Sequence, residues 1–244
     1  MEINKKLNSV QNKTKLLERF IPKYARLPLI CCLLVNTIIY SGTMWLCSDW
    51  KHYDFTLEID RKVPFIPEFI YIYFLCYIFW VVNYIMMAHL GKESFYKFFV
   101  ADIMSRFVCL FFYIVLPTTN VRPEVVGTDF SSQLVRFLYE MDKPANLFPS
   151  IHCLVSWFCY IGIRGRKEIP KWYQVFSCVV AILVFLSTQV TKQHYIVDVV
   201  GGVALAEICF WISKRSTLYI KAQQLFERTK FEEVKCKGGD LFES

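Results

Sequence analysis

The chain has 244 residues, of which 55% are apolar and 17% aromatic, and it carries a formal charge of +7. The apolar residues are gathered into blocks of about 20, a length that suits a hydrocarbon core of roughly 30 Å. The basic residues lie beside these blocks on alternating connections, which is typical of membrane topology. The composition therefore excludes a soluble nucleic-acid-binding protein and predicts an integral membrane protein.

Six apolar blocks predict an all-α fold, a bundle of six transmembrane helices. A basic segment, residues 1–26, precedes the bundle and is expected at the cytoplasmic side or the membrane interface. The six-span domain covers residues 27–213, and a basic cytoplasmic tail covers residues 214–244. The predicted spans are residues 27–47, 65–87, 98–116, 149–163, 175–190 and 195–212.

An even number of spans places both termini on one side of the membrane. Most Lys and Arg residues lie in the terminal segments and in the links near Lys92 and Arg166, so these parts are expected to face the cytoplasm. The longest connection, residues 117–148, then lies on the opposite side, with a short helix expected around residues 131–138. The compact chain favours a bacterial plasma membrane, with an internal eukaryotic membrane as the alternative.

Two histidines begin the fourth and sixth predicted spans, both on the extracytoplasmic side. His194 and Asp198 are four residues apart, so on a helix they share one face. A carboxylate at this spacing fixes the imidazole tautomer and leaves the other ring nitrogen free to act as a nucleophile. A purely structural pair is the alternative, but ionisable groups just inside a span favour function.

His152 follows Pro149 and Ser150, which form a turn into a helix N-terminus. Backbone N–H groups at that N-terminus, together with the Ser150 hydroxyl, make a site for an anion. A histidine beside an anion site is predicted to act as a general acid. The alternative is a polar side chain that is satisfied at the start of its helix.

Nearby polar residues on the same side could bind a phosphate. Arg122 has the planar donor geometry for bidentate phosphate binding, although it could also be an interfacial anchor. Lys192 could contact the same phosphate or be a flanking residue whose ammonium reaches the interface. Asp142 and Asn146 are expected near the site, as substrate contacts or as residues that shape the loop. No metal or cofactor is expected, because no metal-ligand spacing is present.

Two ionisable residues within the third predicted span, Asp102 and Arg106, are four apart and are expected to pair with each other. Glu207 in the sixth predicted span is expected at a similar depth and could join them. All three are interpreted as structural residues, because they lie away from the histidines.

These residues stand in runs that resemble the motifs of the type-2 phosphatidic acid phosphatase superfamily. The run from Pro149 to His152 resembles the family's Pro-Ser-Gly-His motif. Ser187 and Thr188, followed after five residues by His194 and after three more by Asp198, resemble its motif Ser-Arg, five residues, His, three residues, Asp. Arg122-Pro123 resembles the end of its first motif. The family's architecture is also six spans.

The resemblance implies a role for each residue and a lipid phosphate as substrate. His194 would accept the phosphoryl group, and Asp198 would orient the His194 imidazole. His152 would protonate the leaving group. Arg122 and Ser150 would hold the phosphate. The chain departs from the family pattern where the first motif has lysine, the second glycine and the third arginine; those positions are Val115, Ile151 and Thr188.

The loss of two cations is similar to the branch that contains inositol phosphorylceramide synthases and sphingomyelin synthases. These enzymes move a phospho-head-group between lipids, and a phosphodiester with one negative charge needs fewer cations. Three hypotheses follow: a lipid phosphate phosphatase with a phosphohistidine intermediate, a head-group phosphotransferase, or an inert membrane protein that keeps the fold. The sequence does not indicate an oligomeric state.

Overall fold

The structure, a computed structural model, describes residues 18–227. Much of the predicted basic N-terminal segment and the end of the basic tail therefore lie outside the described residues. Helices dominate the described part, as the all-α prediction requires. The elements in chain order are α2 (Lys23–Leu46), β1 (Tyr53–Asp54), α3 (Glu58–Lys62), η1 (Pro67–Phe69), α4 (Ile70–His89), α5 (Lys92–Val115), β2 (Thr118–Thr119), α6 (Phe130–Met141), α7 (Ile151–Ile163), α8 (Lys171–Val190) and α9 (Ile196–Arg215).

Five helices within residues 18–227 are long and apolar enough to cross a membrane: α2, α4 with η1, α5, α8 and α9. The fourth predicted span corresponds to α7, which has only 13 residues. At about 1.5 Å per residue it is roughly 20 Å long, shorter than a hydrocarbon core of roughly 30 Å. The structure therefore confirms an all-α membrane protein with five candidate spans, and it does not confirm the sixth.

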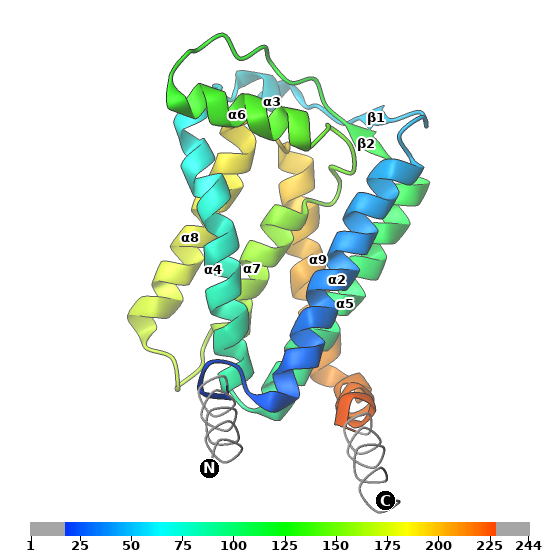
Figure 1. Ribbon diagram of the computed structural model, residues 1–244, viewed down its shortest axis with the longest axis vertical. Helices are drawn as coiled ribbons and strands as arrows, with labels where there is room; N and C mark the ends of the chain where they lie inside the picture. Colours follow the sequence, from blue (N-terminus) through cyan, green and yellow to red (C-terminus); the bar gives the residue numbers. More distant parts are fainter. Residues whose placement is uncertain (1–17, 228–244) are drawn as a thin grey trace, which may run out of the picture.

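Helix α7 is the buried centre of the bundle. It packs against α4, α8 and α9, while α5 packs against α9, and α2 lies along α5 on the outside (Figure 1). Nearly all α7 side chains are buried. Because α7 is covered by protein, its apolar composition serves the core rather than contact with lipid.

The third span begins earlier than the sequence indicates. Helix α5 starts at Lys92, six residues before the predicted boundary, so Lys92 and Lys97 belong to the helix and not to a link. Both ammonium groups reach the bundle end: Lys92 pairs with Glu227 at 2.6 Å and Lys97 with Glu93 at 2.5 Å. Long lysine side chains can therefore extend a span into the interface.

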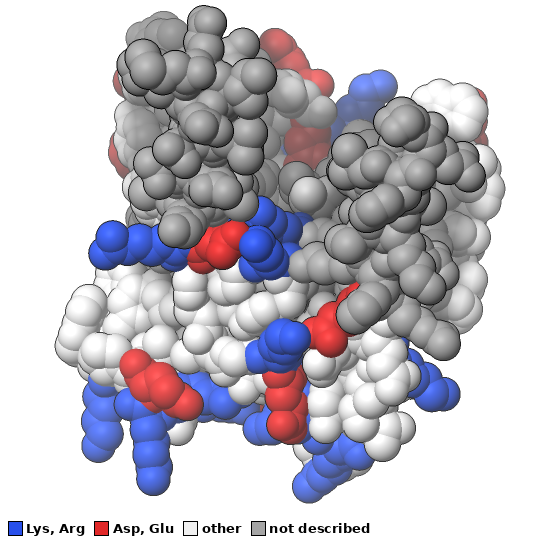
Figure 2. Space-filling view, turned by 60° about the horizontal axis from the view of Figure 1, so that its bottom comes forward, with Lys and Arg blue, Asp and Glu red and all other residues white. Residues whose placement is uncertain are grey.

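Basic side chains gather at one end of the bundle. Helix α2 begins and α9 ends at this end, whereas α7 and α9 begin at the opposite end (Figure 1). Figure 2 is turned to bring this end forward and shows blue Lys and Arg side chains around it. Described residues on its links and helix ends include Lys92, Arg164, Arg166, Lys167, Lys171, Lys214 and Arg215. The positive-inside rule associates such an end with the cytoplasm.

The opposite end is closed by the two long connections. Strands β1 and β2 pair in parallel, with Tyr53 opposite Thr118 and Asp54 opposite Thr119. Helix α6 lies across this end (Figure 1) and confirms the helix predicted within the longest connection. Asp129 caps α6 by accepting a hydrogen bond from the Ser132 backbone N–H at 3.1 Å.

The buried ion pair of α5 is present as predicted. Arg106 Nη2 lies 2.7 Å from Asp102 Oδ1, and the Tyr84 hydroxyl donates to the same oxygen at 2.7 Å. Glu207 does not join this pair: its carboxylate binds Arg164 at 2.8 and 3.0 Å. The prediction for Glu207 was wrong because an arginine beyond the end of α7 lies within its reach.

Candidate active site

The first turns of α7 and α9 lie against each other, and this contact is what brings the two histidines together. The Ser150 N–H donates to the Asp198 carbonyl at 3.1 Å. Gly202 permits this approach, because a Cβ atom there would lie 2.6 Å from the Ser150 carbonyl oxygen. The ring centroids of His152 and His194 are 5.9 Å apart, with the planes inclined at 50°. One imidazole from the first turn of α7 and one from the loop just before α9 thus face one small volume.

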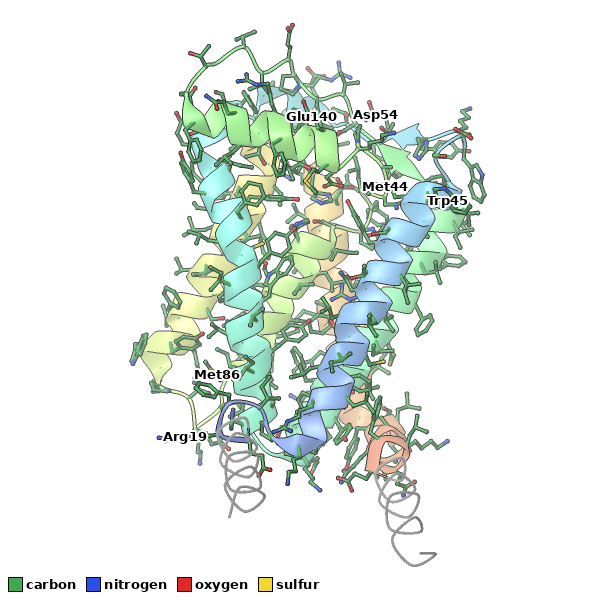
Figure 3. All side chains as sticks on the ribbon, in the orientation of Figure 1. Arg19, Met44, Trp45, Asp54, Met86 and Glu140 are labelled. Carbon is green, nitrogen blue, oxygen red and sulfur yellow. The ribbon has the colours of Figure 1, made fainter. Side chains whose placement is uncertain are left out.

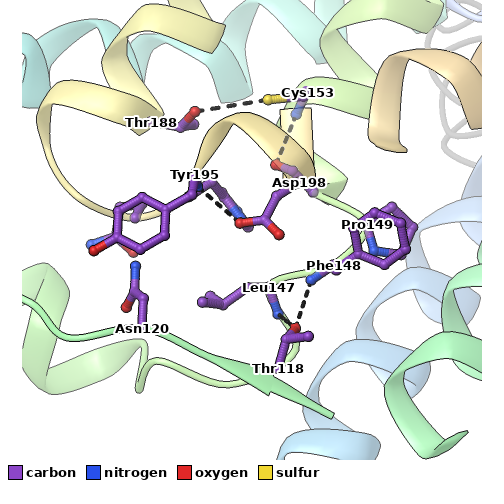
Figure 4. A network of polar contacts seen from close by, with 12 residues as sticks. Thr118, Asn120, Leu147, Phe148, Pro149, Cys153, Thr188, Tyr195 and Asp198 are labelled. Carbon is purple, nitrogen blue, oxygen red and sulfur yellow. Dashed lines mark hydrogen bonds and ion pairs between the residues drawn. The ribbon is translucent and has the colours of Figure 1, made fainter. Parts of the chain in front are cut away.

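Asp198 lies beside His194 but also caps its own helix. Its Oδ2 accepts a hydrogen bond from the Tyr195 N–H at 2.9 Å (Figure 4) and lies 3.6 Å from His194 Nδ1. That second distance is beyond a normal hydrogen bond. Within residues 18–227, the buried Nδ1 has no hydrogen-bond partner. The imidazole is therefore held near a carboxylate without being locked to it.

The backbone of His194 is fixed by the end of α8. Its N–H donates to the Thr188 carbonyl at 3.0 Å, and its carbonyl accepts from Gln189 Nε2 at 2.9 Å. His194 is only 7% exposed. The loop between α8 and α9 thus presents the ring from a rigid support.

His152 is surrounded by aromatic side chains of α4. The hydroxyl of Tyr77 lies 3.2 Å from Nε2, that of Tyr73 lies 3.5 Å from Nδ1, and the ring of Trp80 lies 5.4 Å away. These three residues were not among those predicted from the sequence. Their spacing of four and three positions places them on one helix face, which was the available signal.

Ser150 occupies the N-cap position of α7. Its buried hydroxyl oxygen accepts a hydrogen bond from the Cys153 N–H at 3.3 Å. The O–H of Ser150 is a separate donor that a ligand could use. The structure therefore puts Ser150 where an anion at the α7 N-terminus would meet it.

Arg122 lies beside the His194 loop. Its Nη2 donates to Gln193 Oε1 at 2.8 Å, its Nη1 donates to the Asp142 carbonyl, and the guanidinium stacks 4.7 Å from the Tyr139 ring centre. Nε is buried and has no partner in the described part of the chain. Burial raises the pKa of Tyr139 to about 12, although the positive charge of Arg122 acts to lower that pKa.

Lys192 points to the connection that contains α3. Its Nζ donates to the carbonyls of Asp60 at 3.0 Å and Val63 at 2.6 Å. Burial lowers the pKa of Lys192, and the Asp60 carboxylate opposes this shift. Two of the three ammonium donors are thus occupied by backbone, which leaves one for a ligand.

Asp60 is a further residue that the sequence alone did not reveal. Its carboxylate accepts from the Ile196 N–H at 3.0 Å and from the Leu57 N–H at 2.9 Å, and the residue is 1% exposed. Asp60 therefore caps the start of α9 from a different element. No local pattern marks it, because its partner lies 136 positions away.

Asp142 and Asn146 contact the protein around the turn before α7. The Tyr40 hydroxyl donates to Asp142 Oδ1 at 2.5 Å, and Asn146 Nδ2 donates to Thr43 Oγ1 at 2.9 Å. Thr118 fixes the following residues, since its Oγ1 accepts from the Leu147 and Phe148 N–H groups (Figure 4).

A sequence model of the PAP2 superfamily matches residues 43–212, which include both histidines. This chain belongs to the PAP2 superfamily. An uncharacterized protein of Methanocaldococcus jannaschii is 23% identical over 207 residues, covering 78% of this chain and 84% of that protein. No solved structure matches the chain. PAP2 membership supports a phosphatase-like function on a lipid phosphate, as a phosphoric ester hydrolase or a phosphotransferase.

Two departures from the PAP2 pattern have visible structural consequences. Thr188, in place of the third-motif arginine, is fully buried, and its hydroxyl donates to the Phe185 carbonyl at 2.8 Å. Val115, in place of the first-motif lysine, is 60% exposed at the end of α5. Neither position supplies a cation to this PAP2 site. Within residues 18–227, no group of three or more His, Cys, Asp or Glu residues could hold a metal ion.

Proposed function

We propose that this protein is a membrane-embedded lipid phosphate phosphatase that works through a phosphohistidine intermediate. The observation that carries the proposal is the 5.9 Å separation of the His152 and His194 rings, with Asp198 beside His194. A phosphorus atom between two rings at this separation would be within reach of a nucleophile on one side and a proton donor on the other.

In the first step His194 attacks phosphorus, so that a nitrogen–phosphorus bond forms while the ester phosphorus–oxygen bond breaks. His152 gives its proton to the departing alkoxide, and Asp198 stabilises the charge that develops on His194. A bound phosphate anion beside His152 favours its protonated form. In the second step His152 takes a proton from water, the resulting hydroxide attacks phosphorus, and phosphate leaves His194.

The substrate phosphate would be held by Arg122 and Ser150. Arg122 Nε has no partner among the described residues, and the Ser150 O–H lies at the α7 N-terminus. Lys192 could add its remaining N–H donor. Asp142 and Asn146 would shape the substrate loop, in keeping with their contacts to α2. The donors of Arg122, Ser150 and Lys192 would stabilise the negative charge that grows on the phosphoryl oxygens.

We also propose that both termini are cytoplasmic and that the site faces the outer leaflet, in a bacterial plasma membrane. The end with the basic residues would then face the cytoplasm. The lipid phosphate would enter from the leaflet next to the α7 and α9 N-termini.

Transfer of a phospho-head-group to a lipid alcohol is a second candidate function. Thr188 supplies no charge, and Lys192 directs its ammonium to the carbonyls of Asp60 and Val63. A site with few free cations suits a phosphodiester with one negative charge better than a dianionic monoester. A lipid alcohol would then replace water in the second step.

The first test offers the purified protein in detergent a lipid phosphomonoester and a phosphodiester lipid, with a chelator present. The proposal predicts phosphate release from the monoester, and at least a 1000-fold loss in His194→Ala and in His152→Ala. His89→Ala is the matched control, because His89 is exposed at the far end of α4.

Three outcomes decide between the hypotheses. Turnover of the diester that depends on an added alcohol would replace the phosphatase by the transferase. Activity of His194→Ala close to that of the unaltered protein would overturn the covalent mechanism. No turnover of either lipid by a folded protein would leave the inert membrane protein as the answer.

A further inference from the structure

Helix α6 has three distinct faces. Its buried face, with Val135 and Leu138, packs on the bundle. A second face carries the polar residues Gln133 and Glu140, which are exposed. The third face is apolar yet exposed. A helix that lies in water beside a bundle needs only the first two faces.

The apolar exposed face consists of Phe130, Phe137 and Met141, which are 64%, 53% and 67% exposed. They are spaced by seven and four positions, so they form one stripe along the helix. We refer to these three residues as the α6 stripe. Within residues 18–227 no protein element covers the stripe, and leaving it in water would be costly.

The α6 stripe continues the lipid-facing surface of α4. Tyr71, Leu75, Ile78 and Val82 are exposed at spacings of four, three and four along this spanning helix. At its upper end the Tyr71 ring stacks on Phe130, with centroids 6.4 Å apart. The Tyr71 hydroxyl also accepts a hydrogen bond from Ser131 at 3.1 Å. The two apolar surfaces therefore meet where Tyr71 contacts Phe130.

We propose that α6 is an interfacial helix whose stripe is embedded in the lipid leaflet at the end of the bundle that holds the histidines. The helix lies across that end, where Figure 3 labels its residue Glu140. In this position the α6 stripe contacts lipid, the buried face contacts the bundle, and the polar face contacts water.

The structure fixes α6 firmly in this position. The Tyr139 hydroxyl donates to the Thr191 carbonyl at 2.8 Å, three residues before His194. Arg136 donates to the carbonyls of Val125 and Gly127 at 2.8 and 2.7 Å. Because α6 is tied to the His194 loop, seating the stripe in the leaflet sets the depth of the two histidines at the head-group layer. This inference stands whether or not the proposed reaction is correct.

The test places a photo-reactive benzoylphenylalanine at single positions of the full chain in nanodiscs of palmitoyl-oleoyl phosphatidylcholine. Position 141 probes the α6 stripe, and position 140, about 100° away around the same helix on its polar face, is the matched control. Both side chains are exposed, so neither substitution disturbs the core. After irradiation, mass spectrometry measures the fraction of protein that carries covalently attached phospholipid.

The proposal predicts at least fivefold more lipid adduct at position 141 than at position 140, with position 130 behaving like 141. Equal adduct at 140 and 141, or none at 141, would overturn it. A cross-link at 141 to a second copy of the chain would also overturn it, because the stripe would then be a protein interface.

Discussion

At the scale of single residues, the candidate site depends on polar groups, from side chains and backbone, that bind other parts of the protein rather than substrate. Asp60 caps the start of α9 and its carbonyl receives the Lys192 ammonium. Thr188 and Gln189 fix the backbone of His194. Local sequence patterns could single out His152, His194 and Asp198 as candidates. They could not reveal the support from Asp60, because it acts across 136 positions of the sequence.

Asp60 gives a direct test of this support. Asp60→Ala removes both acceptors of the Ile196 and Leu57 N–H groups, so we expect a loss of roughly 1–3 kcal/mol in the free energy of unfolding. We also expect a lower kcat with little change in KM, because the phosphate contacts stay in place. Unfolding in detergent and steady-state kinetics measure the two effects.

Glu58→Gln is the control for Asp60, since Glu58 is an exposed acid of the same short helix. It should leave both quantities unchanged. If Asp60→Ala behaves like this control, Asp60 has no positioning role.

At the scale of elements, the contact between α7 and α9 matters most. Hydropathy predicts both helices but cannot distinguish a short buried helix such as α7 from a lipid-facing span, because both are apolar. Hydropathy also predicted too late a start for α5, because Lys97 interrupts the apolar run inside the helix. The close approach at Gly202 follows only from three-dimensional packing.

Gly202→Ala tests the contact. The added Cβ would meet the Ser150 carbonyl oxygen at 2.6 Å and the Leu154 nitrogen at 3.2 Å, both of which are backbone atoms. We expect the starts of α7 and α9 to separate, with a cost of about 1–3 kcal/mol in unfolding free energy and at least a tenfold loss of kcat.

Gly42→Ala is the matched control, because nothing lies within 4 Å of a Cβ at that position of α2. It should be neutral or stabilise the protein by roughly 0.5–1 kcal/mol, as expected for alanine in a helix. Full activity of Gly202→Ala would show that this approach does not govern the site.

At the scale of the whole molecule, the chain separates a basic end from the end that holds the two histidines. Family membership and five apolar helices establish an integral membrane protein of the PAP2 superfamily. The sequence could predict the two ends, because charge and hydropathy are local properties. It could not predict how far apart the histidine rings lie, since that distance depends on how α4, α8 and α9 enclose α7.

The central claim is that His194 receives the phosphoryl group and that His152 supplies and removes protons. The most direct measurement incubates His152→Ala with p-nitrophenyl phosphate, whose leaving group needs no proton. Without His152 to activate water, the intermediate should accumulate. Mass spectrometry should then find an acid-labile phosphoryl group on His194, absent from the double variant with His194→Ala. A phosphoryl group on another residue, or hydrolysis with no adduct at any time, would contradict the account.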